Sequence, residues 1–132
     1  MRTLITSCNP DKFNLFEHFK KERQILWRQT KSCEIGDEVF IYVGRPQSRL
    51  LYKCKIIAVD LPSEIVDSDY YKMQTPSSRT KNKPYMRLEL VRKLDNDGLT
   101  LPDLFSHGLK TVQCTTEASP ELREYLNTVV GG

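Results

Sequence analysis

Hydrophobic side chains recur at every second position in residues 37–44, 49–59 and 85–94. Because the side chains of an extended chain point alternately to opposite faces, this period of two predicts β-strands. The turn-forming sequence at 45–48, RPQS, makes the first two of these strands a hairpin. Residues 2–8, RTLITSC, are rich in β-branched types and end at a turn sequence, so they predict a fourth strand.

Three segments of the sequence predict helices. Asp11 can cap a helix over 12–23, whose apolar side chains recur at spacings of three and four residues, namely Phe13, Leu15, Phe16 and Phe19. Residues 25–27, ILW, either close this helix or begin a loop. The sequence LPDLFSHGL at 101–109 predicts a short helix, and 120–130 predicts a terminal helix with one apolar side.

Residues 61–84 have a different composition from the rest of the chain. They contain three prolines, few aliphatic residues and the run PSSRTKNKP, which predicts a long mobile loop. A loop of this length inside a compact domain is uncommon unless it is functional or disordered. The order of strand, helix, further strands and closing helices predicts one α+β domain over 1–132, a small mixed β-barrel with helices packed around it.

The composition is that of an ordinary globular domain. At 132 residues, 28% charged and 39% hydrophobic, the chain can bury one core without staples. It contains no apolar run near the ~20 residues that span a bilayer and no signal-peptide pattern, so we expect a cytoplasmic protein with no membrane partner. Four cysteines without metal-ligand spacing favour packing roles, and we expect neither a metal nor another cofactor.

The net charge of +3 is unevenly distributed. Residues 1–93 contain 18 Lys or Arg and 11 Asp or Glu, whereas residues 94–132 contain 2 and 6. A body of net charge +7 can attract a polyanion, because Lys and Arg displace counterions from phosphates. The alternative is a solvated surface of uneven composition.

No motif marks a catalytic or nucleotide-binding site. His18 lies in the predicted first helix, and His107 precedes the glycine that ends a short helix, where an imidazole can bond the last carbonyls. The aromatic residues allow two interpretations. Trp27 and the tyrosines either complete the core, or they line a pocket that stacks a flat ring.

The sequence resembles the EVE-type domains of the PUA-like superfamily over nearly its whole length. The resemblance rests on a Trp after the first helix, a GDEVFIY strand and a hairpin to LLYKCKI, within the stretches LITSCNPDKF, ILWRQTKSCEIGDEVFIYVGRPQSRLLYKCKII, YMRLELVRKL and LPDLFSHGLKTVQ. It is strongest to the EVE-like domains of modification-dependent HNH restriction endonucleases, and more distant to YTH domains.

The resemblance implies a reader that flips a modified base into an aromatic pocket. Ser7, Cys8 and Asn9 would face the base edge, and Trp27 would stack on its ring. Tyr70, Tyr71 or Met73 would form the second wall of the pocket, and Tyr42 and Tyr52 would lie at its floor. Phosphate contacts would come from basic residues of the first helix and the loops: Lys12, Arg28, Lys31, Arg45, Arg49, Arg79, Lys81 and Lys83.

These implications predict a non-catalytic reader of modified nucleic acid. We expect DNA that carries a modified cytosine such as 5-methylcytosine, rather than RNA, and Trp27→Ala should abolish selective binding while the fold survives. No HNH motif is present, so the chain is either the recognition module of a restriction endonuclease or a stand-alone protein. The alternatives are an RNA-binding domain or small hydrolase of the related ASCH type, with a Lys or Tyr near the cleft, and a protein-interaction module.

Overall fold

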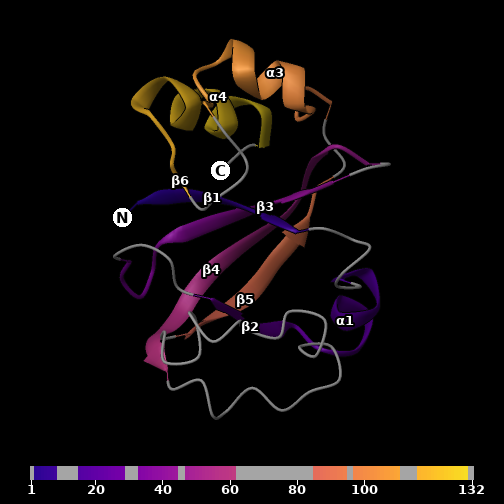
Figure 1. Cartoon of the computed structure of the whole chain (residues 1–132), viewed down its shortest axis with the longest axis vertical. Coiled ribbons are helices and arrows are strands. Elements are labelled where there is room, and N and C mark those ends of the chain that lie inside the picture. The colour runs from indigo at the N-terminus through magenta and orange to yellow at the C-terminus, as the bar shows by residue number, and fades with distance from the viewer. Residues whose placement is uncertain are drawn as a thin grey trace, which may run out of the picture.

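The computed structural model describes residues 2–8, 15–28, 33–44, 47–61, 85–94, 97–110 and 116–130. Within these ranges the chain forms helices and a mixed sheet (Figure 1). The elements are β1 (Thr3–Cys8), α1 (Leu15–Lys21), β2 (Gln24–Arg28), β3 (Glu38–Val43), β4 (Arg49–Leu61), β5 (Tyr85–Lys93), α3 (Leu101–Ser106), β6 (Thr116–Glu117) and α4 (Pro120–Val130).

The six strands form one sheet in the order β2-β5-β4-β3-β1-β6. Strands β1 and β3 run parallel, and every other neighbouring pair is antiparallel. The parallel pair requires a crossover, and α1 and β2 lie in the chain between the two strands. The predicted hairpin of β3 and β4 is confirmed, with a register shift between Ile41 and Tyr42.

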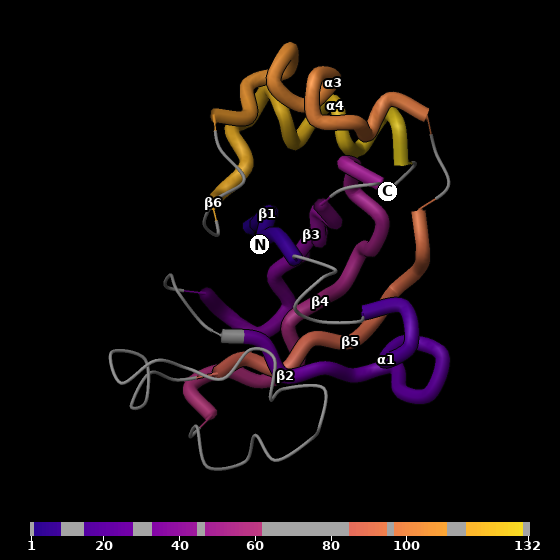
Figure 2. The backbone as a smooth tube through the Cα atoms, turned by 45° about the vertical axis from the view of Figure 1, so that its right-hand side comes forward, coloured from indigo at the N-terminus to yellow at the C-terminus, as the bar shows by residue number. Residues whose placement is uncertain are grey.

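Each face of the sheet has its own buried cluster. On one face, side chains of β1, β3 and β4 pack against α3 and α4, which lie together over one end of the sheet (Figures 1 and 2). On the other face, strands β1 to β5 and Leu15 of α1 share a second cluster. We call the first the helix-side cluster and the second the interior cluster. Their presence explains why the β3 sequence EVFIYV is apolar at nearly every position.

The Gly36-Asp37 pair before β3 has a structural role. Gly36 has a φ of +99°, which glycine adopts without the steric cost of a side chain. The buried carboxylate of Asp37 accepts hydrogen bonds from the backbone N–H groups of Arg2 and Glu34, each at 2.9 Å. This pair therefore joins the turn before β3 to the chain just before β1.

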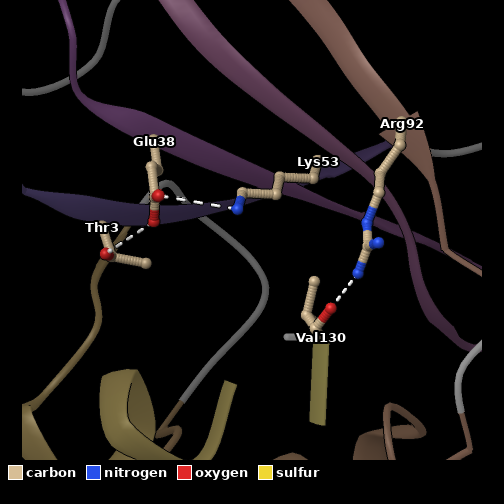
Figure 3. Close-up of polar contacts among 5 residues, drawn as sticks. All are labelled: Thr3, Glu38, Lys53, Arg92 and Val130. Carbon is tan, nitrogen blue, oxygen red and sulfur yellow. Dashed lines mark hydrogen bonds and ion pairs between the residues drawn. The ribbon is translucent and has the colours of Figure 1, made fainter. Parts of the chain in front are cut away.

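Polar side chains on the helix side of the sheet link the N-terminal strand β1 to its neighbours. The ammonium of Lys53 lies 3.6 Å from a carboxylate oxygen of Glu38, whose other oxygen accepts a hydrogen bond from Thr3 at 3.4 Å (Figure 3). Arg92, which faces Lys53 in the β4–β5 register, donates to the backbone carbonyl of Val130 in the last turn of α4. The contact of Arg92 with Val130 joins α4 to β5, and the other two contacts link β1, β3 and β4.

Most elements predicted from the sequence are confirmed. The strands at 37–44, 49–59 and 85–94 correspond to β3, β4 and β5, and the helix at 120–130 to α4. One prediction is wrong, because residues 25–27 neither close a helix nor begin a loop. They belong to β2, which pairs with β5. The short strand β6 was not predicted, residues 62–84 lie outside the described ranges, and the single-domain assignment stays a prediction.

Candidate nucleic-acid interface

Trp27 lies inside the curled sheet. Its side chain is 6% exposed, and its indole Nε1 donates a hydrogen bond to Thr6 Oγ1 at 3.1 Å. Thr6 belongs to β1 and Trp27 to β2, and three strands separate β1 from β2 in the sheet order. A side-chain bond between them requires the sheet to curl until these two strands face one another across the interior.

Tyr52 joins Trp27 in the interior cluster and packs against two phenylalanines of α1. The Tyr52 ring centroid lies 4.8 Å from that of Phe19 and 6.0 Å from that of Phe16, the latter in an edge-to-face arrangement. Such geometries favour aromatic packing because ring edges are positive and ring faces negative. The sequence assigned Phe16 and Phe19 to the apolar stripe of a helix, and only the fold brings them to Tyr52.

The thiol of Cys8 belongs to the same cluster as Tyr52 and Cys54. Burial raises the pKa of both thiols from 9.0 to about 12. Burial, followed by the nearby Cys8 and Cys54 groups, raises the pKa of Tyr52 to about 12 as well. All three groups are therefore protonated and neutral at physiological pH, and the interior has the character of an uncharged aromatic and thiol surface.

The structure separates two of the predicted pocket residues from the others. Tyr42 is buried in the helix-side cluster. Ser7 pairs with Tyr42 in the β1–β3 register, and strand alternation puts it on the same side as Ile5. Cys8, Trp27 and Tyr52 thus come together on one face, whereas Ser7 and Tyr42 lie on the other. The remaining pocket candidates, Asn9, Tyr70, Tyr71 and Met73, lie outside the described ranges.

Few of the predicted phosphate-binding residues can be placed. Arg49 is half-buried at the start of β4, and its Nε donates to the Leu50 carbonyl at 3.3 Å. The backbone of Arg28 ends β2 and pairs with Tyr85. The other six fall outside the described ranges, namely Lys12, Lys31, Arg45, Arg79, Lys81 and Lys83, and their role stays a prediction.

The sequence did not single out Lys93. This residue ends β5, faces Tyr52 in the β4–β5 register, and places its ammonium 5.8 Å from the Phe16 ring centroid. Two register shifts in the pairing of β4 and β5 occur before Ala58. Because a shift of one residue changes which side chains face one another, alternation along the sequence cannot predict this pair.

Both histidines have structural partners. His18 is buried, and its Nε2 lies 2.7 Å from the backbone carbonyl of Gln24. His107 Nδ1 lies 2.9 Å from the carbonyl of Asp103, and its ring stacks on Tyr125 with centroids 3.6 Å apart. In the described part of the chain, no three His, Cys, Asp or Glu side chains are grouped to hold a metal ion. There, too, no helix is long and apolar enough to cross a bilayer.

Comparisons with known proteins place the fold. No family model and no curated protein matches the sequence. Human THYN1, solved in complex with DNA containing 5-methylcytosine, matches with a TM-score of 0.68 at 13% identity, over 97% of this chain and 96% of that one. The ASCH protein of Zymomonas mobilis matches with a TM-score of 0.65 at 15% identity, over 96% and 94%. A protein from Pseudomonas putida matches with a TM-score of 0.66 at 16% identity, over 96% and 97%.

These matches cover nearly the full length of each chain, so the similarity includes the whole architecture. At such low identity the similarity shows the fold alone. The chain therefore has an α+β, PUA-like fold of the kind found in ASCH and THYN1 proteins.

Proposed function

We propose that this chain is a non-catalytic reader of modified DNA, which takes a flipped modified cytosine into the interior of its curled sheet. The observation that carries the proposal is the gathering of Cys8, Trp27 and Tyr52 into one uncharged interior cluster. Support also comes from the fold, which resembles that of a protein solved with 5-methylcytosine DNA.

The chemistry of the cluster suits a methylated base. Flipping a base out of its stack costs a few kcal/mol, and stacking on an aromatic ring recovers about 1 to 3 kcal/mol per base. A methyl group buried against Trp27 or Tyr52 would add about 0.8 kcal/mol. The remaining free energy must come from hydrogen bonds to the base edge and from phosphate contacts.

Trp27 would contribute the face of its ring rather than its N–H group, because that donor already bonds to Thr6. Since the side chain is only 6% exposed, other groups cover the ring in the free protein. Base stacking on Trp27 therefore requires these groups to move. The same burial argues against our expectation that Trp27→Ala leaves the fold intact, since truncating a buried Trp leaves a cavity.

The ionisation of the cluster supports a binding role over a catalytic one. A thiolate is the reactive form of cysteine, and the pKa values of Cys8 and Cys54 near 12 keep both as thiols at neutral pH. Tyr52 is likewise held protonated. The resemblance to endonuclease reader modules extends the proposal to a nuclease partner that cleaves the DNA this domain selects.

The test uses the single Trp of the chain. Oligonucleotides carrying 5-methylcytosine, 5-hydroxymethylcytosine, N6-methyladenine or plain bases are titrated against the protein while Trp27 emission is recorded. We expect a saturable change in emission and the tightest binding with a modified cytosine. Equal affinity for modified and plain oligonucleotides would contradict the proposal.

A second candidate is an RNA-binding or hydrolytic role of the ASCH type. It is favoured by the similarity to the Zymomonas mobilis ASCH protein and by the pair of buried Lys53 and partly buried Glu38, whose side chains are 7% and 20% exposed. A buried lysine beside a carboxylate can serve in proton transfer. Turnover of RNA or DNA without added metal, abolished by Lys53→Met, would replace the reader proposal with this one.

A further inference from the structure

The ammonium of Lys93 lies beside an aromatic ring, whereas three other lysines form ion pairs with carboxylates. Lys20 pairs with Glu17 at 3.2 Å, Lys53 with Glu38 at 3.6 Å and Lys55 with Glu89 at 3.8 Å. Across the described ranges, no carboxylate lies within ion-pair distance of Lys93. Its ammonium instead lies over the ring of Phe16.

The position of Lys93 connects it to the interior cluster. It is exposed at the end of β5 and faces Tyr52 in the register of β4 and β5. Phe16 lies between the two, with its ring edge-to-face with Tyr52 and under the ammonium of Lys93. Phe16 and Phe19 are half-buried and pack against the cluster from α1. Lys93 therefore marks the rim of the cluster on the side of α1.

We propose that Lys93 binds a backbone phosphate next to the flipped nucleotide, with the Phe16 ring holding the ammonium at the rim. This inference rests on the proposed function and specifies how the DNA backbone meets the site. A base inserted into the interior leaves its sugar and phosphates at the rim, so a cation there is placed to bind them.

The electrostatics of this position suit a phosphate. An ammonium over an aromatic face keeps a cation–π attraction while its outer side stays open to an anion. The acidic residue beside Phe16 on α1 is Glu17, and its carboxylate is already bound to Lys20. Backbone phosphates carry a full negative charge at each linkage, and binding them releases counterions from the DNA.

The test compares Lys93→Met with Lys55→Met, both measured with a labelled oligonucleotide by fluorescence anisotropy. Methionine keeps an apolar stem against Phe16 and removes the charge. Lys55 is the matched control because it is an exposed β4 lysine already paired with Glu89. We expect Lys93→Met to lower the salt slope of log K by about 0.7 to 0.9 and affinity about five- to eightfold at 0.1 M salt, whereas Lys55→Met changes neither.

A neutral methylphosphonate linkage beside the modified base makes the test specific to one phosphate. The wild-type protein should lose about the same five- to eightfold with the linkage on one side of the base, and Lys93→Met should be insensitive to it. If Lys93→Met keeps the wild-type salt slope and sensitivity to methylphosphonate, the inference is wrong. If the wild-type protein does not prefer modified DNA, the proposed function fails instead, and the two failures are distinguished by the wild-type titration alone.

Discussion

The indole N–H of Trp27 reaches across the interior of the sheet to the hydroxyl of Thr6, 3.1 Å away. The contact joins β2, an edge strand, to β1, from which three other strands separate it in the sheet. The orientation of the Trp27 ring therefore depends on how the sheet curls. Because this ring is the proposed stacking surface, the geometry of the site depends on Thr6 as well as on Trp27.

We expect Thr6→Val to destabilise the protein by about 1 to 3 kcal/mol, because it leaves the buried indole N–H without this acceptor. Valine matches threonine in shape, so the change isolates the hydroxyl. Thr6→Ser keeps the acceptor and is the control. Urea unfolding measures the free energy, and the emission maximum of Trp27 reports its environment. Equal stability of the valine and serine variants would show that the hydrogen bond contributes nothing.

Trp27→Ala should cost about 3 to 5 kcal/mol of stability, because it removes a large buried side chain and leaves a cavity. Trp27→Phe keeps a ring in the interior and should cost less. Thermal and urea unfolding of the two variants make the comparison. A well-folded Trp27→Ala protein with nearly wild-type stability would contradict the buried position of the ring and restore the expectation drawn from the sequence.

The ion pair of Lys53 and Glu38 should respond unequally to loss of either partner. Glu38→Gln leaves an ammonium that is 7% exposed without its carboxylate and should cost about 3 to 5 kcal/mol. Lys53→Met should cost less, since Glu38 is 20% exposed and can gain water. The double variant should be more stable than Glu38→Gln alone. Urea unfolding of all three proteins tests the order, and equal losses in the two single variants would contradict it.

Stability should fall as the pH rises above about 9. Cys8, Cys54 and Tyr52 have pKa values near 12 in the folded protein, against 9.0 for a free thiol and 10.0 for a free tyrosine. Between pH 9 and 12 the unfolded chain loses these protons first, so ionisation favours unfolding. Each such group adds up to about 1.4 kcal/mol per pH unit to the loss.

Urea unfolding at pH 8 and pH 10.5 measures this alkaline loss. Cys54→Ala should reduce it because the variant lacks one of the groups that ionise on unfolding. The variant is also less stable at pH 8 from lost packing, so the comparison concerns the change with pH alone. An unchanged dependence on pH would show that the Cys54 thiol is already ionisable in the folded state.

Gly98 and Tyr125 should be energetically coupled. The Tyr125 hydroxyl donates to the Gly98 carbonyl at 2.7 Å, and a Cβ at Gly98 would lie 2.7 Å from that hydroxyl oxygen. Gly98 also has a φ of +86°, which strains any other residue. Gly98→Ala should therefore cost more in the wild-type protein than in Tyr125→Phe, where the clash is gone. A double-mutant cycle measures the difference, and additive losses would contradict it.

Much of the fold can be predicted from local patterns. The period-two alternation of 37–44, 49–59 and 85–94 identified β3, β4 and β5, because a sheet residue sees opposite faces at successive positions. The segment 25–27 could not be identified in this way. All three of its side chains are buried in the interior cluster, so the strand has no alternation, and its pairing with β5 is remote in sequence.

The sequence by itself determined the order of the elements other than β2 and β6, the basic body and the aromatic residues available for a site. Only the tertiary structure decided which of these residues share a face. In the folded chain Trp27, Tyr52 and Cys8 share the interior cluster, Tyr42 lies on the opposite face, and the Lys93 ammonium lies over the Phe16 ring. The physical reason is that periodicity follows from local backbone geometry, whereas the partners of a side chain depend on strand order, register shifts and the curl of the sheet.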